Sequence, residues 1–401
     1  MSCVGIVAEY NPFHNGHRYH LSEAKRVTGA EHAIVVMSGS FVQRGEPAVA
    51  DKFTRAEWAL KNGADMVIEL QEVFSCACAE RFASGAVRLL AATGLVDSLC
   101  FGSETGNIDK LSKVSSAEID RAQLDEALSS GLSFPKAMAR ASDAPLAPND
   151  ILGVEYLRAI RKFAPHIKPY AVKRIGGGYA EAELCGEYSS ASAVRNALKT
   201  AADVQRMSPA VFDGLLAALP KDVLDDLAAM LKEGVVPASD TRLSDVILYR
   251  MRCMSAEEIA ALPEVSEGLE NLFVRHSTAH GDYSRMLAGV KSKRYTMARL
   301  KRISMCALLG ISEQLQRSAF KDDSCLYLRV LGIKKSSEKL LSLLSEKSKA
   351  PVVIAAADRE KLCVKACEVM DAASRANSIH ALARPYDNRA IEDISHRLII
   401  V

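Results

Sequence analysis

The sequence predicts a doubly wound α/β domain with a Rossmann-like parallel sheet, followed by a mostly α-helical C-terminal domain. Up to about residue 174, short runs rich in Val and Ile alternate with helical patterns, as buried parallel strands and their crossover helices do. From about residue 201 apolar residues recur at helical spacing, as in Val211, Leu215 and Leu219. We therefore expect one domain at residues 1–200 and a second at residues 201–401.

The expected elements of the first domain follow in order along the chain. Strands are predicted at residues 4–10, 32–37, 64–70, 98–101 and 169–174. Helices are predicted from about residue 17 to Gly29, at 52–62 after a capping Asp51 and before Gly63, at 82–92, and at 151–163. Ligands bind at the carboxyl ends of such strands, so the polar loops after the first, second and fourth strands are where we expect a site.

The second domain ends in two runs that can form strands. Residues 326–331 and 351–355 have this pattern, and we expect them to build a small α/β appendage from about residue 322.

Composition excludes several classes of protein. Hydrophobic content of 49% and charged content of 25% are typical of a soluble globular chain. The net charge of +2 means that any nucleic-acid surface must be local. No apolar run approaches the ~18 residues of a membrane span, and the N-terminus has the pattern of a strand rather than of a signal peptide. Ten scattered cysteines without a pairing pattern favour a cytoplasmic protein. The close cysteine pairs Cys76/Cys78 and Cys363/Cys367 favour buried thiols over zinc ligands.

The first strand runs into a loop with two histidines, His14 and His17, around Gly16. A helix that begins there offers free backbone N–H groups, which favour phosphate. Residues three apart lie on one side of the first turn, so both imidazoles can donate to an α-phosphate whose charge grows during nucleotidyl transfer. The alternatives are two histidines that only cap a helix, and a zinc site, for which no third ligand is evident.

A second anion site is predicted at residues 189–195. Serines that open a helix, with Arg195 one turn in, suit the β- and γ-phosphates of a nucleotide. The alternative is a plain serine N-cap.

These motifs carry a family resemblance. The H-x-G-H motif and the later S-S-x-S-x-V-R run resemble the HIGH-motif nucleotidyltransferase superfamily. Residues 7–17, 37–39, 43–48, 67–70 and 101–104 resemble in particular the bacterial tRNA(Met) cytidine acetate ligase family. The sequence departs from that family at Gln71, where the family usually has Pro, and over residues 72–80.

The resemblance implies a set of site residues. His14 and His17 would be catalytic. Asn149 and Arg174 also fit a ligand site without the resemblance, because they are an amide at a helix start and a cation at a strand end. An N-cap for Asn149 and a surface ion pair for Arg174 are the alternatives. With Ser190 and Arg195 from the second anion site, the expected ATP-binding residues are Val7, Ala8, Glu9, Tyr10, Asn11, Pro12, Phe13, His14, Asn15, Gly16, His17, Arg18, Tyr19, His20, Gly102, Asn149, Arg174, Ser190 and Arg195.

Residues 283–303 form a strongly basic segment without an acidic residue. A stripe of Met297, Leu300, Ile303 and Ala307 would be buried, leaving the basic side chains outside and Tyr283 and Tyr295 free to stack on bases. The alternative is a solvated basic helix face. The resembling family has a similar run that is associated with tRNA binding. The expected tRNA-binding residues are therefore Lys291, Lys293, Arg294, Tyr295, Arg299 and Arg302, with Arg275, His276 and His280 as a possible extension.

The resemblance implies the following reaction. Acetate attacks the α-phosphate of ATP to give acetyladenylate, with Mg²⁺ bound through the triphosphate. N4 of the wobble cytidine (C34) of elongator tRNA(Met) then takes the acetyl group, forming N4-acetylcytidine and releasing AMP. Acetyl-CoA, a membrane and an obligate protein partner are not expected.

Two other functions remain open at this point. An adenylyltransferase that joins ATP to a small phosphorylated acceptor would use the same phosphate motifs. An RNA-binding protein that only senses ATP would need no catalytic histidine.

Overall fold

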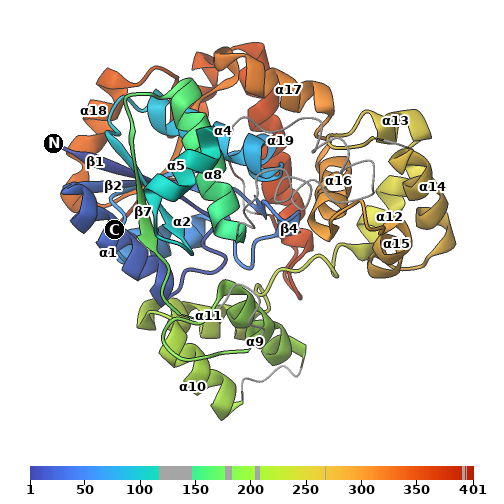
Figure 1. The fold of residues 1–401 in the computed structure, drawn as a ribbon. Coiled ribbons are helices and arrows are strands. Elements are labelled where there is room, and N and C mark those ends of the chain that lie inside the picture. Colours follow the sequence, from blue (N-terminus) through green and yellow to red (C-terminus); the bar gives the residue numbers. More distant parts are fainter. Residues whose placement is uncertain (117–146, 177–182, 204–207, 267, 391–392, 394) are drawn as a thin grey trace.

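A central eight-stranded sheet organises the protein, in the strand order β10-β8-β5-β2-β1-β6-β7 with β9 beside β8 (Figure 1). The computed structural model describes residues 1–116, 147–176, 183–203, 208–266, 268–390, 393 and 395–401. The strands are β1 (Cys3–Ala8), β2 (His32–Ser38), β5 (Met66–Leu70), β6 (Ser98–Ser103), β7 (Lys168–Lys173), β8 (Leu328–Ile333), β9 (Val352–Val353) and β10 (Ile399–Ile400). A separate hairpin pairs β3 (Phe41–Val42) with β4 (Glu46–Pro47).

Helices cover both faces of this sheet and extend beyond it. Those of the first half are α1 (Asn15–Thr28), α2 (Lys52–Lys61), α3 (Glu72–Ser75), α4 (Ala79–Ala92), α5 (Ile108–Ser116) and α8 (Pro148–Phe163). Those of the second half are α9 (Ala191–Asp203), α10 (Pro209–Ala218), α11 (Lys221–Glu233), α12 (Ser244–Cys253), α13 (Ala256–Ala260), α14 (Leu269–Ala279), α15 (Tyr283–Val290), α16 (Met297–Leu309), α17 (Glu313–Lys321), α18 (Lys339–Lys347) and α19 (Val364–Leu382). Within the described ranges, no helix combines the length and apolarity that crossing a membrane requires.

Strand β2 shows why the sheet is covered on both sides. Ile34 and Val36 belong to one hydrophobic core, with residues of α4 and α8, whereas Val35 and Met37 belong to the other, with residues of α1 and α2. A strand that is apolar on both faces can be buried only between two helical layers. Strands β2, β1, β6 and β7 are parallel, as is β5 beside β2. The doubly wound α/β fold predicted from the sequence is therefore confirmed.

The C-terminal strands correct one expectation. Residues after about 322 do not form a separate appendage, because β8 pairs antiparallel with β5 and β10 extends the sheet beside β8. All six residues of β8 are buried. An apolar strand of this kind needs cover on both faces and a partner for its backbone, and the open edge of β5 supplies the partner. The main sheet therefore contains both ends of the chain.

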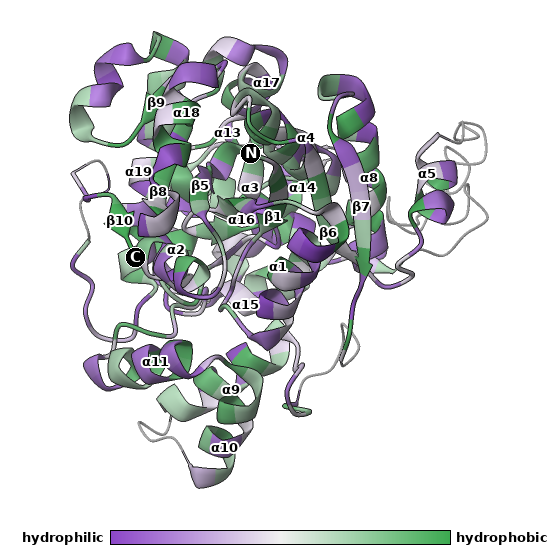
Figure 2. Ribbon diagram, turned by 90° about the vertical axis from the view of Figure 1, so that its left-hand side faces the viewer, coloured by the Kyte–Doolittle hydropathy of each residue, from purple (hydrophilic) through white to green (hydrophobic). Residues whose placement is uncertain are grey.

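The helices of the second half form two groups. Helices α9, α10 and α11 pack against the α1/α2 side, where Trp58 Nε1 of α2 donates to Asp226 Oδ2 of α11 at 2.8 Å. Helices α12 to α16 form the other group, on the right of Figure 1. In Figure 2 hydrophilic residues lie on the outer turns of α11 and α18. The mostly helical character expected after residue 201 is thus observed up to α17.

Local details agree with the sequence in part. Asp51 caps α2, and its Oδ1 accepts from the backbone N–H groups of Phe53 and Thr54 at 3.0 Å each. Of the cysteine pairs expected to be buried, only Cys76 is fully so, and Cys363 is exposed. Cys363 caps α19, where the chain turns at the surface, and its thiol donates to the Ser324 carbonyl at 3.2 Å.

Arg55 of α2 links the loops at the carboxyl ends of the first two strands. It is fully buried, and its guanidinium donates to the carbonyl oxygens of Glu9 (2.7 Å), Ser38 (3.1 Å), Ala50 (3.0 Å) and Gly39. Burial lowers the pKa of Arg55 to about 10, so the group stays charged at neutral pH. Four carbonyls from three loops therefore share one buried cation.

We expect Arg55→Leu to lower the free energy of unfolding by about 3 kcal/mol or more, because several buried carbonyls would lose their donor. Urea denaturation followed by circular dichroism measures this change. Arg26→Leu is the control, since Arg26 pairs with Glu23 on the surface of α1 and should shift the midpoint little. Equal midpoints for the two variants would contradict the role given to Arg55.

Candidate nucleotidyltransferase site

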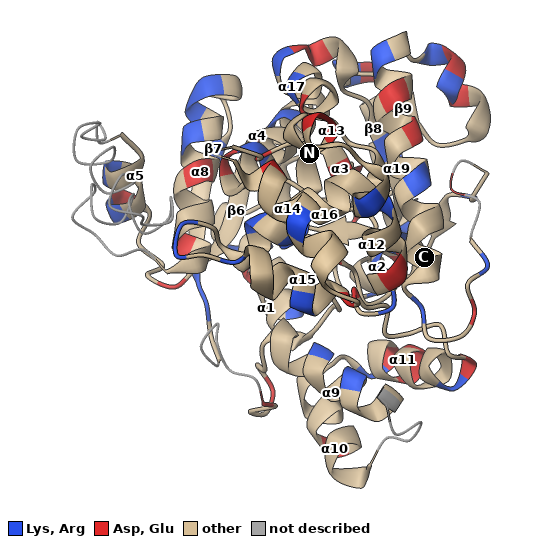
Figure 3. Ribbon diagram, turned by 90° about the vertical axis from the view of Figure 1, so that its right-hand side faces the viewer, with Lys and Arg blue, Asp and Glu red and all other residues tan. Residues whose placement is uncertain are grey.

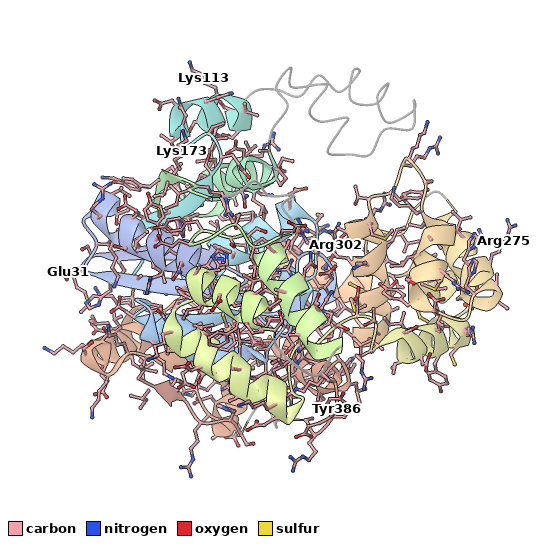
Figure 4. All side chains as sticks on the ribbon, turned by 90° about the horizontal axis from the view of Figure 1, so that it is seen from below. Glu31, Lys113, Lys173, Arg275, Arg302 and Tyr386 are labelled. Atoms are coloured by element: carbon pink, nitrogen blue, oxygen red, sulfur yellow. The ribbon has the colours of Figure 1, made fainter. Side chains whose placement is uncertain are left out.

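A cavity of about 220 Å³ opens at the carboxyl ends of the parallel strands. It lies where β1, β6 and β7 end and where α1 and α8 begin, which is where ligands bind in open α/β sheets. Its lining residues are Val7, Ala8, Glu9, Tyr10, His14, Gly16, His17, Tyr19, His20, Gln43, Arg44, Phe82, Phe101, Gly102, Asn149, Leu152, Tyr156, Val172, Lys173, Arg174, Ile175, Tyr188, Ser189 and Ser190. Lys173, labelled in Figure 4, marks the β7 side.

His14 and His17 form the start of α1. His14 is the N-cap, and its Nδ1 accepts from the Gly16 N–H at 3.1 Å. His17 Nδ1 in turn accepts from the His14 N–H at 3.3 Å, and the two rings stack with centroids 3.7 Å apart. A neutral imidazole that accepts at Nδ1 carries its proton at Nε2. Both rings therefore present an Nε2–H donor, and helix capping and ligand binding are compatible roles for them.

Burial keeps these rings neutral. It lowers the pKa of His14 to about 3, with the nearby Arg174 and Arg195 acting in the same direction. Burial, together with the neighbouring His14 and Arg174, also holds the pKa of His17 well below its usual value. Neutral donors with fixed protons, beside free backbone N–H groups of a helix start, suit a phosphate group.

The second anion site lies partly at the cavity. Ser190 lines it and also caps α9, because its Oγ accepts from the Ala193 N–H at 3.1 Å. Arg195 lies behind the wall, where its guanidinium donates to the Asn11 carbonyl at 2.7 Å. Its structural task is therefore to hold the loop before α1. Arg174 stands in the wall and forms no ion pair within the described residues.

Asn149 and Gly102 occupy the β6/α8 side. Asn149 lies in the first turn of α8, and its Nδ2 donates to Glu104 Oε1 at 2.6 Å. Glu104 also accepts from the Asp150 N–H at 3.1 Å, so it holds the start of α8 against the end of β6. The N-cap of α8 is Ala147, so Asn149 does not serve as the N-cap, which was the alternative role considered for it.

Some expected residues support the cavity from behind. Asn11 Oδ1 accepts from the Val49 N–H at 2.7 Å, and Asn15 Nδ2 donates to the Ala217 carbonyl at 2.9 Å. Pro12 and Phe13 are buried, and Arg18 is exposed. None of these five residues lines the cavity.

Other lining residues were missed from the sequence. Gln43, Arg44 and Phe101 lie inside motifs that carried the family resemblance, so a signal existed for them. The others come from helices, strands and loops that meet only in the fold, and they are Phe82, Leu152, Tyr156, Val172, Lys173, Ile175 and Tyr188. The atypical segment from Gln71 to residue 80 contributes no lining residue, and Gln71 Nε2 instead donates to the Tyr327 carbonyl at 3.2 Å.

The basic segment needs several corrections. Tyr283 and Tyr295 are 3% and 5% exposed, so neither is available to stack on a base. Met297, expected in the buried stripe, is 38% exposed. Helix α16 begins at Met297, and its first turn lies at the surface while the later stripe residues are buried.

The two arginines of α16 are occupied by the protein itself. Arg302 pairs with Glu264 at 2.6 Å and donates to the Gln43 carbonyl at 3.2 Å. Arg299 donates to the Glu264 carbonyl at 2.9 Å through Nε. Figure 4 shows Arg302 between the α/β part and the α12–α16 group, and Arg275 at the outer edge of that group. These contacts correct the expectation that Arg302 and Arg299 point outward.

The other three cations expected to bind tRNA are accessible. Lys291, Lys293 and Arg294 are all exposed in the connection between α15 and α16. The α12–α16 group faces the viewer in Figure 3. We name the exposed connection of Lys291, Lys293 and Arg294 the basic loop.

Comparison with known proteins defines the family. The model of the HIGH Nucleotidyl Transferase family matches residues 1–393, and the chain belongs to this family. The tRNA(Met) cytidine acetate ligase of Acetivibrio thermocellus is 37% identical over 380 residues, which is 90% of each chain. The enzyme of the same name from Caldanaerobacter subterraneus subsp. tengcongensis is 35% identical over 420 residues and covers both chains completely.

Solved structures agree with these relatives. Thermotoga maritima TmcAL in its apo form I has a TM-score of 0.91 at 32% identity, with 100% of both chains covered. The same protein bound with alpha-thio ATP has a TM-score of 0.89 at 32% identity, covering 100% of this chain and 99% of that one. The family resemblance read from the sequence is confirmed.

The fixed protons of the two histidines give a spectroscopic prediction. At pH 5 the rings of His14 and His17 should still be neutral, with the proton on Nε2, because burial disfavours the charged form. Two-dimensional ¹⁵N NMR of histidine-labelled protein distinguishes the tautomers. In urea the same rings should titrate near about 6.5. A proton on Nδ1 of either ring in the folded protein would contradict the proposed geometry.

Proposed function

We propose that this chain is an ATP-dependent tRNA ligase that activates acetate as acetyladenylate and transfers the acetyl group to N4 of the wobble cytidine (C34) of elongator tRNA(Met). The observation that carries this is the pair of neutral, stacked histidines at the start of α1, in the wall of the cavity. The names of the full-length relatives, and the ATP analogue bound to the Thermotoga maritima protein, support it.

In the first step acetate attacks the α-phosphate of ATP and pyrophosphate leaves. Negative charge grows on the α-phosphate oxygens, and the Nε2–H groups of His14 and His17 can donate to them. Arg174 and Ser190 line the same cavity and suit the remaining phosphates. We propose that Mg²⁺ enters with the nucleotide, screening the triphosphate charge and aiding the departure of pyrophosphate.

In the second step the exocyclic amine of the cytosine attacks the acetyl carbonyl and AMP is released. The base must leave its stack to enter the cavity, and an anticodon loop allows this at low energetic cost. We propose that residues 1–200 hold ATP and acetate and that the basic loop contacts tRNA phosphates. Lys291, Lys293 and Arg294 are exposed and basic, as such a surface requires.

The direct test is chemical. The purified protein, ATP, ¹⁴C-acetate and tRNA(Met) should give acid-precipitable label that nuclease digestion recovers as N4-acetylcytidine. An adenylyltransferase for a small phosphorylated acceptor would instead leave tRNA unlabelled and convert a nucleotide monophosphate. That pattern would replace the proposed function.

We expect His14→Ala and His17→Ala each to reduce acetate-dependent ATP–pyrophosphate exchange by about 100-fold, because each removes a donor to the α-phosphate. tRNA affinity, measured by filter binding, should stay within twofold of wild type. The exposed His166 supplies a matched control, as His166→Ala removes an imidazole outside the cavity. Full exchange activity in both histidine variants would show that neither imidazole stabilises the α-phosphate, whereas a wild-type protein that binds tRNA but shows no acetate-dependent exchange would only sense ATP.

Removing the cations of the basic loop should weaken tRNA binding. For Lys293→Ala/Arg294→Ala we expect the slope of log affinity against log salt to fall by about one to two, since each phosphate contact adds nearly one to that slope. Lys232→Ala in α11 is an exposed control. An unchanged slope for the double variant would remove the basic loop from the RNA surface.

A further inference from the structure

The cavity wall contains one carboxylate among the described residues, Glu9. Glu9 follows β1 directly and precedes the loop that leads to α1. Its Oε1 accepts from the Gln43 N–H at 3.0 Å. Within the described parts of the chain Glu9 forms no ion pair, and its Oε2 receives no hydrogen bond. One carboxylate oxygen is thus held in place and the other is left for a bound molecule.

The other polar groups in the wall are poorly suited to take up a proton. The Nδ1 atoms of His14 and His17 already accept backbone N–H groups, so both rings act as donors. His20 has a buried Nε2 that finds no hydrogen-bond partner among the described residues, but burial and Arg174 lower its pKa to about 4. Burial has the opposite effect on a carboxyl group and raises the pKa of Glu9, which makes its carboxylate a stronger base.

The sheet order separates two sides of the cavity at the end of β1. Gly102 lies in β6, Asn149 in α8 and Arg174 directly after β7, all on one side of β1. The family resemblance assigns these residues to the nucleotide, together with residues 7–20, so Glu9 lies at the border between the two sides. Gln43 and Arg44 come from the β3–β4 turn, which follows β2 on the other side of β1. The Glu9 carboxylate accepts a hydrogen bond from Gln43 on this second side. The second side is free to bind the molecule that receives the acetyl group.

The β3–β4 turn is also the part of the wall that contacts α16, the helix that follows the basic loop. Arg302 of α16 donates to the Gln43 carbonyl, and Lys301 of α16 pairs with Glu46 at 2.5 Å. A Cβ on Gly45 would lie 2.4 Å from the Arg302 backbone nitrogen, so only glycine permits this contact. Helix α16 begins three residues after Arg294. An RNA bound at the basic loop therefore approaches the cavity from the side of Glu9.

We propose that Glu9 is the catalytic base of the transfer step and accepts a proton from N4 of the acceptor cytosine as this nitrogen attacks the acetyl carbonyl. The N4–C bond forms, the bond between the acetyl carbon and the AMP phosphate oxygen breaks, and AMP leaves as an anion. The proton rests on the Glu9 carboxylate and passes to water after product release. This inference rests on the function proposed above. Cytosine N4 is a weak nucleophile, because its lone pair is delocalised into the ring, so proton removal has a large effect.

Glu9→Gln tests this role, because the amide oxygen can still accept the Gln43 N–H while the side chain no longer takes up a proton. Two rates are measured on the full chain: acetate-dependent ATP–pyrophosphate exchange, and single-turnover acetyl transfer from preformed acetyladenylate to tRNA(Met). We expect the ratio of transfer to exchange to fall by about 100-fold in Glu9→Gln. Glu9→Asp should fall between Glu9→Gln and wild type.

Hydroxylamine provides a second readout. It is a strong nucleophile that needs no base, so it should trap the acetyladenylate of Glu9→Gln as acetohydroxamate at a rate much closer to wild type than transfer to tRNA is. Glu233→Gln in α11 is the matched control, because it changes an exposed carboxylate outside the cavity and should leave both rates near those of wild type. His20→Gln changes a residue of the cavity wall and should lower exchange and transfer in equal proportion.

Three results would overturn the assignment. An equal fall of exchange and transfer in Glu9→Gln would mean that Glu9 positions the nucleotide. A selective loss of transfer in His20→Gln would make His20 the base. Wild-type rates of both exchange and transfer in Glu9→Gln would show that transfer needs no base at this position. A wild-type protein without any acetate-dependent exchange or tRNA labelling would instead refute the proposed function itself.

Discussion

The buried guanidinium of Arg55 is the interaction on which the architecture of the site depends. A charged group in a protein interior is stable only where hydrogen bonds replace its hydration shell. Here backbone carbonyls do so, and they come from the ends of β1 and β2 and from the segment before α2. The Glu9 carbonyl is one of them. The same contact therefore fixes the start of the histidine loop and the loop that leads into the β3–β4 turn.

A second buried ionic group links the C-terminal tail to the sheet. Lys52 is fully buried and lies 2.6 Å from Glu69 Oε1 and 2.7 Å from Asp393 Oδ1. Because removal of one partner would leave an uncompensated charge in the core, the three groups must assemble together. Glu69 belongs to β5 and Asp393 lies shortly before β10. The C-terminal residues are consequently joined to the main sheet, although the sequence pattern predicts a domain division at residue 200.

Local features of the sequence identified several residues that line the cavity, because a strand end, a helix start and the side chains between them are neighbours in the chain. His14, Gly16 and His17 all line the cavity for that reason. Long-range pairing was not predictable in the same way. The β5–β8 ladder joins residues such as Ile68 and Val330, and nothing in either segment specifies its partner. The apolar wall residue Tyr156 likewise reaches the cavity only through the packing of α8.

The basic segment shows how composition alone misleads. The sequence of residues 283–303 suggests one continuous cationic surface, but in the fold some of these side chains are occupied by contacts within the protein. Arg302 finds the carboxylate of Glu264, and Tyr295 is buried with the Arg299 guanidinium 5.0 Å from its ring centroid. These contacts attach α16 to the rest of the chain.

Because Arg302 is buried in these contacts, it can position the β3–β4 turn, which an exposed arginine could not do. Arg302 donates a hydrogen bond to the Gln43 carbonyl, and the Gln43 N–H donates to the Glu9 carboxylate. A chain of two hydrogen bonds therefore runs from the helix that follows the basic loop to the only carboxylate in the described cavity wall. Arg302 is fixed by a buried ion pair, so the carboxylate has little freedom to move relative to α16. An enzyme that must bring a base on a large RNA to a small activated acid needs the two binding surfaces in a fixed relation, and the β3–β4 turn supplies that relation.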